Sequence, residues 1–226
     1  MHLLIIAATE FEIQETVSFI NNSNPDFDGH FTSIQITGIG GVATTYNLSS
    51  LIHKKKPDII LQAGIAGCFT ARKSADVICI KEEIFGDLGV WENGEFKTVF
   101  DLKLVTENEE PFTNTILVNP YEKLLSLLPL EQSRAITVNE ISTKREQIEW
   151  IKQKFSPVVE SMEGAAFHYV CLKEHIPFLQ LRSISNEIGE RDKSKWKMKE
   201  AIAALNKQLI LIIQEIYLHN ETYFRI

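Results

Sequence analysis

The feature that most constrains this fold is a series of short apolar runs, each bounded by turn residues. Each run has the length of a β-strand, and most are rich in Ile and Val. Several are apolar on both faces, which predicts a central sheet covered by helices on either side. The runs are Leu3–Ala8, Ser33–Gly38, Asp58–Gly64, Asp76–Ile80, Ala135–Val138, Pro157–Glu160 and Pro177–Ser185.

Helical patterns lie between these runs, and the alternation of strands with helices predicts an α/β fold. The chain has 226 residues and no repeat or linker, so we expect a single domain (residues 1–226) with a central mixed β-sheet flanked by helices. The polar segment Glu82–Pro111 predicts hairpins or longer strands with irregular loops. The helical segments are Glu10–Ile20, Ala43–Ile52, Ile148–Phe155, Glu163–His175 and a last helix with an apolar stripe from Trp196 to Ile216.

Composition excludes several classes of function. The net charge is −7, and the only basic cluster, His53–Lys56, is typical of a solvated helix end before a proline. A nucleic-acid partner is therefore not expected, because phosphate binding needs clustered Lys and Arg. The apolar stretch Leu209–Leu218 is too short to span a bilayer, so no membrane partner is expected either.

The three cysteines are far apart and lack the spacing of metal ligands. Their apolar neighbours predict reduced, buried thiols in a cytoplasmic protein, and the N-terminus lacks the features of a signal peptide. No His, Cys and Asp cluster suggests a metal site, so neither a metal nor a cofactor is expected.

Polar residues follow several of the predicted strands. Glu10 and Glu12 begin a helix, where acids are mildly stabilising; a general base would need one carboxylate to face a cleft. The glycine-rich segment Thr37–Thr45 does not match a phosphate loop. The segment Gln62–Phe69 predicts a turn whose backbone amides are free to donate, or a plain turn.

Two further strand ends carry charge. In "VVESMEGAAFHYVC" the acids Glu160 and Glu163 stand where a buried strand meets a buried helix, so each needs solvent or a partner. In "LRSISNEIGERD" Arg182 lies inside a strand pattern, which predicts a carboxylate partner, and Asn186 ends the strand. Because ligands bind at the ends of strands in α/β sheets, Glu12, Glu163, Arg182 and Asn186 predict one pocket.

The motifs "GIG", "QAGIAG", "VESMEGAA" and "LRSISN" occur in an order that resembles the nucleoside phosphorylase and nucleosidase superfamily. The resemblance implies a small-molecule purine nucleoside as ligand and a homodimer, for which the apolar residues of Phe85–Phe100 could form the interface. It implies that Glu12 activates water, that Arg182 lies near that water, and that Glu163 binds the ribose hydroxyls. The other substrate-binding residues implied are Ile65, Ala66, Gly67, Ile141, Ser161, Met162, Ser185 and Trp196.

Within this superfamily the chain resembles nucleosidases more than phosphorylases, because acids after the first strand would repel phosphate. Adenine nucleosidases end the later strand in "ISD", whereas this chain has Asn186 there. An amide can donate to the O6 and N7 acceptors of a 6-oxopurine, which favours hydrolysis in the manner of futalosine hydrolases. A 5′-methylthioadenosine/S-adenosylhomocysteine nucleosidase and a non-catalytic nucleoside-binding protein are the alternatives. Asn186, Asp192 or water could protonate the departing base.

Overall fold

The computed structural model describes residues 1–22, 31–70, 74–127 and 129–218. It confirms the predicted α/β class with a central mixed sheet and flanking helices: strands and helices alternate along much of the chain, and β3 to β7 follow one another without a helix between them. The strands are β1 (His2–Ala7), β2 (Phe31–Ile36), β3 (Ile59–Cys68), β4 (Val77–Phe85), β5 (Gly89–Glu92), β6 (Glu95–Thr98), β7 (Leu117–Val118), β8 (Gln132–Thr137), β9 (Val159–Ser161) and β10 (Phe178–Glu187). The helices are α1 (Glu10–Asn22), α2 (Gly41–Lys54), α3 (Glu122–Leu125), α4 (Arg145–Phe155), α5 (Gly164–Lys173) and α6 (Met198–Leu218), with a 3₁₀ turn at Lys193–Lys195.

The main sheet has the order β10-β4-β8-β9-β3-β1-β2, and β7 pairs with β4. It is mixed: β3 runs antiparallel to β9 and β4 runs antiparallel to β10, whereas the other pairings along this order are parallel. Strand β10 also pairs with β3, which closes β3, β10, β4, β8 and β9 into a ring. The carboxyl ends of the parallel strands β1, β3 and β10 therefore point the same way, and the antiparallel β9, only three residues long, lies entirely beside the end of β3.

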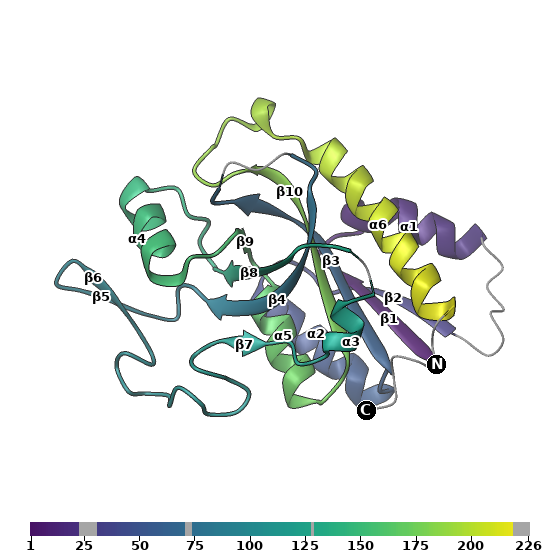
Figure 1. The fold of residues 1–226 in the computed structure, drawn as a ribbon, viewed down its shortest axis with the longest axis horizontal. Helices are drawn as coiled ribbons and strands as arrows, with labels where there is room; N and C mark the ends of the chain where they lie inside the picture. Colours follow the sequence, from purple (N-terminus) through teal and green to yellow (C-terminus); the bar gives the residue numbers. More distant parts are fainter. Residues whose placement is uncertain (23–30, 71–73, 128, 219–226) are drawn as a thin grey trace.

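Helices cover both faces of the sheet (Figure 1). On one face, Leu3, Ile5 and Leu61 pack against α6 and α1. On the other face, Leu4 and Ile6 pack against α2 and α5. The strands are thus apolar on both sides because both sides are covered, as the sequence predicts.

Strand β3 is longer than the sequence predicts. The glycines of "QAGIAG" were expected in a turn, but Gly64 and Gly67 lie inside β3, paired with β10 and, at Gly67, also with β9. Pairing on both edges supplies the backbone hydrogen bonds that hold this glycine-rich segment extended. The glycines allow close approach: an added Cβ would overlap the Arg182 guanidinium at Gly64 and the Ile188 side chain at Gly67.

The structure places two further aromatic segments, Trp196 and Phe85–Phe100, for which the sequence left alternatives. Trp196 was expected in the first turn of the last helix, but α6 begins at Met198 and Trp196 ends the preceding 3₁₀ turn. In Phe85–Phe100, Phe96 is buried beside Trp91 and Trp150, so the β5–β6 hairpin packs on α4. Core packing thus accounts for Phe96, and the homodimer stays a prediction.

The last helix is a core helix. Helix α6 is 21 residues long and apolar enough to cross a membrane by length and composition, so its length alone does not exclude a membrane. Half of its most apolar window is buried inside the protein, however, and its stripe includes Leu205, Leu209 and Ile213 in the core. Burial against the sheet and α1 explains this apolar character.

One amide side chain of α6 is inserted into the backbone of α1. Helix α1 is irregular at Ile13, which has φ −126° and ψ 17°. At this point the Thr16 backbone N–H donates to Asn206 Oδ1 (2.9 Å), and Asn206 Nδ2 donates to the Glu12 carbonyl oxygen (2.9 Å). Asn206 thus bridges the donor and acceptor that an i→i−4 hydrogen bond would join, and such insertions kink helices.

We expect Asn206→Leu to lower the free energy of unfolding by roughly 2–3 kcal/mol, because it leaves buried polar groups of α1 without partners. Urea denaturation measures this change. Gln214→Leu, which removes an exposed amide from the same helix, is the control and should change stability by less than about 0.5 kcal/mol. Equal effects of the two substitutions would show that the insertion contributes no stability.

Candidate active site

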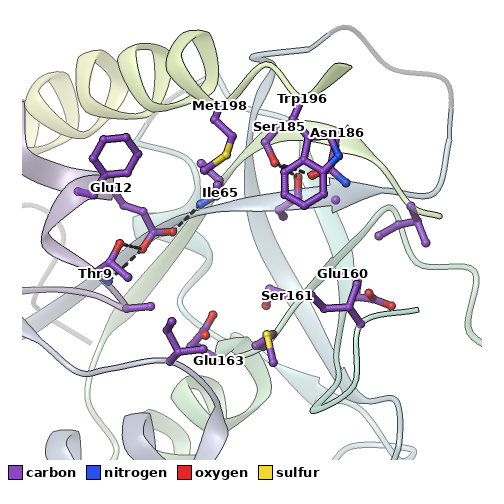
Figure 2. Close-up of a pocket in the computed structure, with 18 of the residues that line it drawn as sticks. Thr9, Glu12, Ile65, Glu160, Ser161, Glu163, Ser185, Asn186, Trp196 and Met198 are labelled. Carbon is purple, nitrogen blue, oxygen red and sulfur yellow. Dashed lines mark hydrogen bonds between the residues drawn. The ribbon is translucent and has the colours of Figure 1, made fainter. Parts of the chain in front are cut away.

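A cavity of about 440 Å³ opens where the carboxyl ends of β1, β3, β9 and β10 meet (Figure 2). This volume is in the range of small-molecule sites. Apolar side chains form most of the wall, and a few polar groups face one another across it. The lining residues are Ala8, Thr9, Phe11, Glu12, Ile39, Ile65, Ala66, Gly67, Ile141, Glu160, Ser161, Met162, Glu163, Ser185, Asn186, Ile188, Arg191, Trp196 and Met198.

Glu12 is fixed by the start of α1. Its Oε2 accepts from the backbone N–H and the hydroxyl of Thr9 (3.1 and 3.0 Å), which is the reciprocal contact of a T-x-x-E capping box. Its Oε1 accepts from the Ile65 backbone N–H of β3 (3.1 Å). Glu12 is 8% exposed, and its two carboxyl oxygens accept from three donors. Figure 2 shows these contacts on one side of the cavity.

Glu163 lies across the cavity from Glu12 (Figure 2). It is the residue before α5, and it is 7% exposed. Oε1 accepts from the Gly40 backbone N–H (3.0 Å), which comes from the glycine-rich turn before α2. That turn therefore holds a carboxylate, and the positive φ values of Gly38 (85°) and Gly40 (89°) explain its glycines.

Arg182 lies behind the two carboxylates. It is 2% exposed, its Nη2 donates to Gln62 Oε1 (3.0 Å), and it forms an ion pair with Glu163 at 3.8 Å. Its Nη1 and Glu12 Oε1 both lie over the Cα of Gly64, where no Cβ could fit. The predicted carboxylate partner of Arg182 is therefore confirmed. The guanidinium is not among the groups that line the cavity, so it acts on the two acids from behind.

Glu160 is a third acid of the cavity wall, to which the sequence assigned no role. It is 5% exposed, and its Oε1 accepts from the Ser142 backbone N–H (3.0 Å), which holds the loop that carries Ile141. Burial raises the pKa of Glu160. Its position inside the short strand β9, two residues after Val158, was the one available signal.

The end of β10 carries a short polar chain. Asn186 Oδ1 lies 2.8 Å from the Ser185 hydroxyl, and Asn186 Nδ2 donates to the Glu187 carbonyl oxygen (2.9 Å). Trp196 stands over this end of the cavity, and its indole N–H donates to the Glu190 carbonyl oxygen (3.0 Å). In Figure 2 the ring of Trp196 lies beside Asn186.

Most residues singled out in the sequence line this one cavity. The exceptions are Glu10, Arg182 and Asp192. Asp192 is exposed and accepts from the Ser194 backbone N–H and hydroxyl (3.0 and 2.7 Å), away from the cavity wall. The sequence analysis assigned no role to the lining residues Ala8, Thr9, Phe11, Ile39, Ile188, Arg191 and Met198, although several of them lie within or beside the motifs that it used.

A metal site is not visible in the described part of the chain, where no group of three His, Cys, Asp or Glu side chains is placed to hold an ion. The chemistry that the cavity offers by itself is proton transfer by carboxylates and hydrogen bonding by an amide.

Comparison with known proteins gives the family. Residues 3–216 match the phosphorylase superfamily. The chain therefore belongs to this superfamily.

Relatives within it are nucleosidases of two kinds. A futalosine hydrolase from Thermus thermophilus is 28% identical over 182 residues, 79% of this chain and 80% of that protein. A 5′-methylthioadenosine/S-adenosylhomocysteine nucleosidase from Tolumonas auensis is 25% identical over 192 residues, 81% of this chain and 80% of that protein.

Solved structures share the fold. A 5′-methylthioadenosine/S-adenosylhomocysteine nucleosidase from Helicobacter pylori, with butyl-thio-DADMe-Immucillin-A, superposes with a TM-score of 0.79 at 18% identity, covering 95% of this chain and 98% of that one. A futalosine hydrolase from the same organism gives a TM-score of 0.76 at 18% identity, with the same coverage.

We expect Arg182→Met to destabilise the protein by about 3–5 kcal/mol at neutral pH, because it leaves Glu163 and Glu12 without their buried cation. Thermal and urea unfolding measure the loss. Arg134→Met is the control: Arg134 pairs with Glu82 at a site where both side chains are about a third exposed, so the loss there should be at most about 1 kcal/mol. A loss at position 182 no larger than that at position 134 would contradict the role of Arg182 as counter-ion.

Proposed function

We propose that this protein is a nucleosidase that hydrolyses the N-glycosidic bond of a 6-oxopurine nucleoside, with futalosine as the preferred substrate. The observation that carries the proposal is the placement of Glu12 and Glu163 on facing walls of one cavity that ends at Asn186. A purine beside Asn186 and a ribose beside Glu163 would bring the bond between them toward Glu12.

The charges of the cavity support water as the nucleophile. Among its lining residues Glu12, Glu160 and Glu163 are acids, and Arg191 is the single cation. Arg182 is engaged by Glu163 and Gln62 and lies outside the lining. A phosphate ion would meet repulsion from the acids, whereas a neutral water would not.

The hydrogen bonds of Asn186 support a 6-oxopurine. Its Oδ1 faces the Ser185 hydroxyl, so the amide presents Nδ2 to a ligand. One N–H of Nδ2 donates to the Glu187 carbonyl, and the second is left for the O6 or N7 acceptor of the base. Where that N–H meets the 6-position of the base, adenine would place a donor, its 6-amino group, against it and leave both groups unsatisfied, whereas N7 is an acceptor in both purines.

The reaction follows from these positions. Glu12 accepts a proton from water as the oxygen attacks C1′, and the bond from C1′ to the purine nitrogen breaks with its electron pair moving to the base. Glu163 accepts from the 2′- and 3′-hydroxyls, and its charge favours the cationic character that C1′ gains. Nδ2 of Asn186 stabilises the departing purine anion. Asp192 is not among the residues that line the cavity and accepts from Ser194, so water is the proton donor that the proposal assigns.

A second candidate is hydrolysis of 5′-methylthioadenosine or S-adenosylhomocysteine, the substrates in the names of several relatives. If the Asn186 amide turns by 180°, Oδ1 can accept from the 6-amino group while Nδ2 donates to N7. The choice between the two substrates therefore depends on the orientation of one amide.

We expect the purified protein to release hypoxanthine from futalosine at a kcat/KM at least tenfold above that for adenine release from 5′-methylthioadenosine. Ultraviolet absorbance or chromatography of the free base measures both reactions. Glu12→Gln should lower kcat by about 10²–10⁴-fold and leave nucleoside binding nearly unchanged, because the general base is lost and the volume is kept. Comparable release of adenine would overturn the substrate, and binding without turnover in the parent chain would indicate a non-catalytic binding protein.

Asn186→Asp should move the preference toward adenine nucleosides. An ionised aspartate accepts from the 6-amino group of adenine but repels O6 of hypoxanthine. We expect the ratio of kcat/KM for futalosine to that for 5′-methylthioadenosine to fall by about tenfold or more, which corresponds to about 1.4 kcal/mol. Ser194→Asp, an exposed polar-to-acid change outside the cavity, is the control and should leave the ratio unchanged.

A further inference from the structure

A buried carboxyl group that the proposed reaction does not use lies beneath the cavity. Glu83 of β4 is 0% exposed. Its Oε1 accepts from Gln180 Nε2 (2.7 Å) on β10, and its Oε2 accepts from the Thr137 hydroxyl (3.0 Å) on β8. Buried acids need such partners, because burial without them costs several kcal/mol.

The Glu83 contacts continue to the start of α5. The Thr137 Oγ1 that donates to Glu83 also accepts from the Ala165 backbone N–H (2.7 Å). That N–H belongs to the first turn of the helix and has no acceptor within it. Gly164 packs directly on the carboxyl group, where an added Cβ would overlap Glu83 Oε1 and Gln180 Nε2. The residue before this turn is Glu163.

Charge connects Glu83 to the same place. Burial raises the pKa of Glu83 to about 7, while the Gln180 and Thr137 hydrogen bonds and the positive charge of Arg182 oppose that rise. Arg182 is also the ion-pair partner of Glu163. Burial lowers the pKa of His168 of α5 to about 3, so that side chain adds no charge.

We propose that Glu83 is a positioning residue for ribose recognition: through Thr137 and the Ala165 backbone N–H it fixes the first turn of α5, and thereby the carboxylate of Glu163. The inference rests on the proposed function, since it assigns the ribose to Glu163. Loss of Glu83 should therefore weaken the binding of the ribose and not that of the free base. The purine end of the cavity is built from β3 and from the end of β10 and does not include α5.

The test compares a nucleoside with its free base in chains that carry Glu12→Gln, so that the nucleoside is not consumed. The ligand pairs are futalosine with hypoxanthine and 5′-methylthioadenosine with adenine, measured by calorimetry. Thr137→Val cuts the link at constant shape, and Glu83→Gln removes the acid at constant size. Glu82→Gln is the matched control, because Glu82 is the neighbouring acid of β4 and pairs with Arg134 near the surface.

We expect Thr137→Val and Glu83→Gln each to raise the Kd of the nucleoside by roughly tenfold and that of the free base by less than twofold. Glu82→Gln should change neither. If Glu83→Gln fails to fold, the Kd values of Thr137→Val alone decide whether Glu83 has this role, because that variant leaves the buried acid in place. Equal changes for nucleoside and base, or no change for either, would overturn the role of Glu83. If the Glu12→Gln parent binds neither nucleoside, the proposed function fails and this inference fails with it.

Discussion

The structure depends on one buried cation placed among acids. Arg182 is almost fully buried, and carboxylates from three separate elements lie around it: Glu163 before α5, Glu12 in α1 and Glu83 in β4. Taking one such charge out of water costs several kcal/mol unless partners compensate. Here Glu163 compensates Arg182 directly as its ion-pair partner, Gln62 accepts from the guanidinium, and Glu12 and Glu83 add negative charge nearby while their hydrogen bonds go to other groups. The ends of β1, β3, β9 and β10 are thereby drawn together, which an apolar core alone would not specify.

Hydrogen bonds from neighbouring elements also orient the side chain of Glu12. Asn206 of α6 replaces a backbone hydrogen bond of α1 immediately after Glu12, so the turn that carries this acid is fixed from outside the helix. Thr9 and Ile65 then hold the carboxylate itself. Hydrogen bonds fix the positions of these groups. A displacement would leave buried polar atoms without partners, so these bonds restrict the side chains more strictly than apolar contacts do.

The sequence predicts much of this arrangement, because strands that are apolar on both faces require a covered sheet and its polar ends must then meet. Glu12, Glu163 and Asn186 follow from that logic. The extension of β3 does not, since Gly64 and Gly67 have low strand propensity and only pairing with β10 and β9 keeps them extended. Glu82 and Glu83 are adjacent acids that point to opposite faces of β4, and the sequence does not tell which one is buried. Asn206 is likewise one polar residue in an apolar stripe, whose partners lie about 190 residues earlier.

The residues that shape the cavity differ from the residue to which we assign the choice of base, so one fold can have different specificities. The sheet, the helices and the counter-ion Arg182 shape the cavity, and apart from the end of β10 the proposal assigns none of them a contact with the base. In the function that we propose, discrimination is left to Asn186, whose amide oxygen accepts from the hydroxyl of Ser185 next to it. Because a hydrogen-bonded amide opposite the wrong base edge leaves two buried groups unsatisfied, a change at this single residue can alter the preferred base while the charges that hold the sugar stay in place. Substrate choice in such a site is therefore separable from the stability of the fold, whereas the geometry of Glu12 and Glu163 is not.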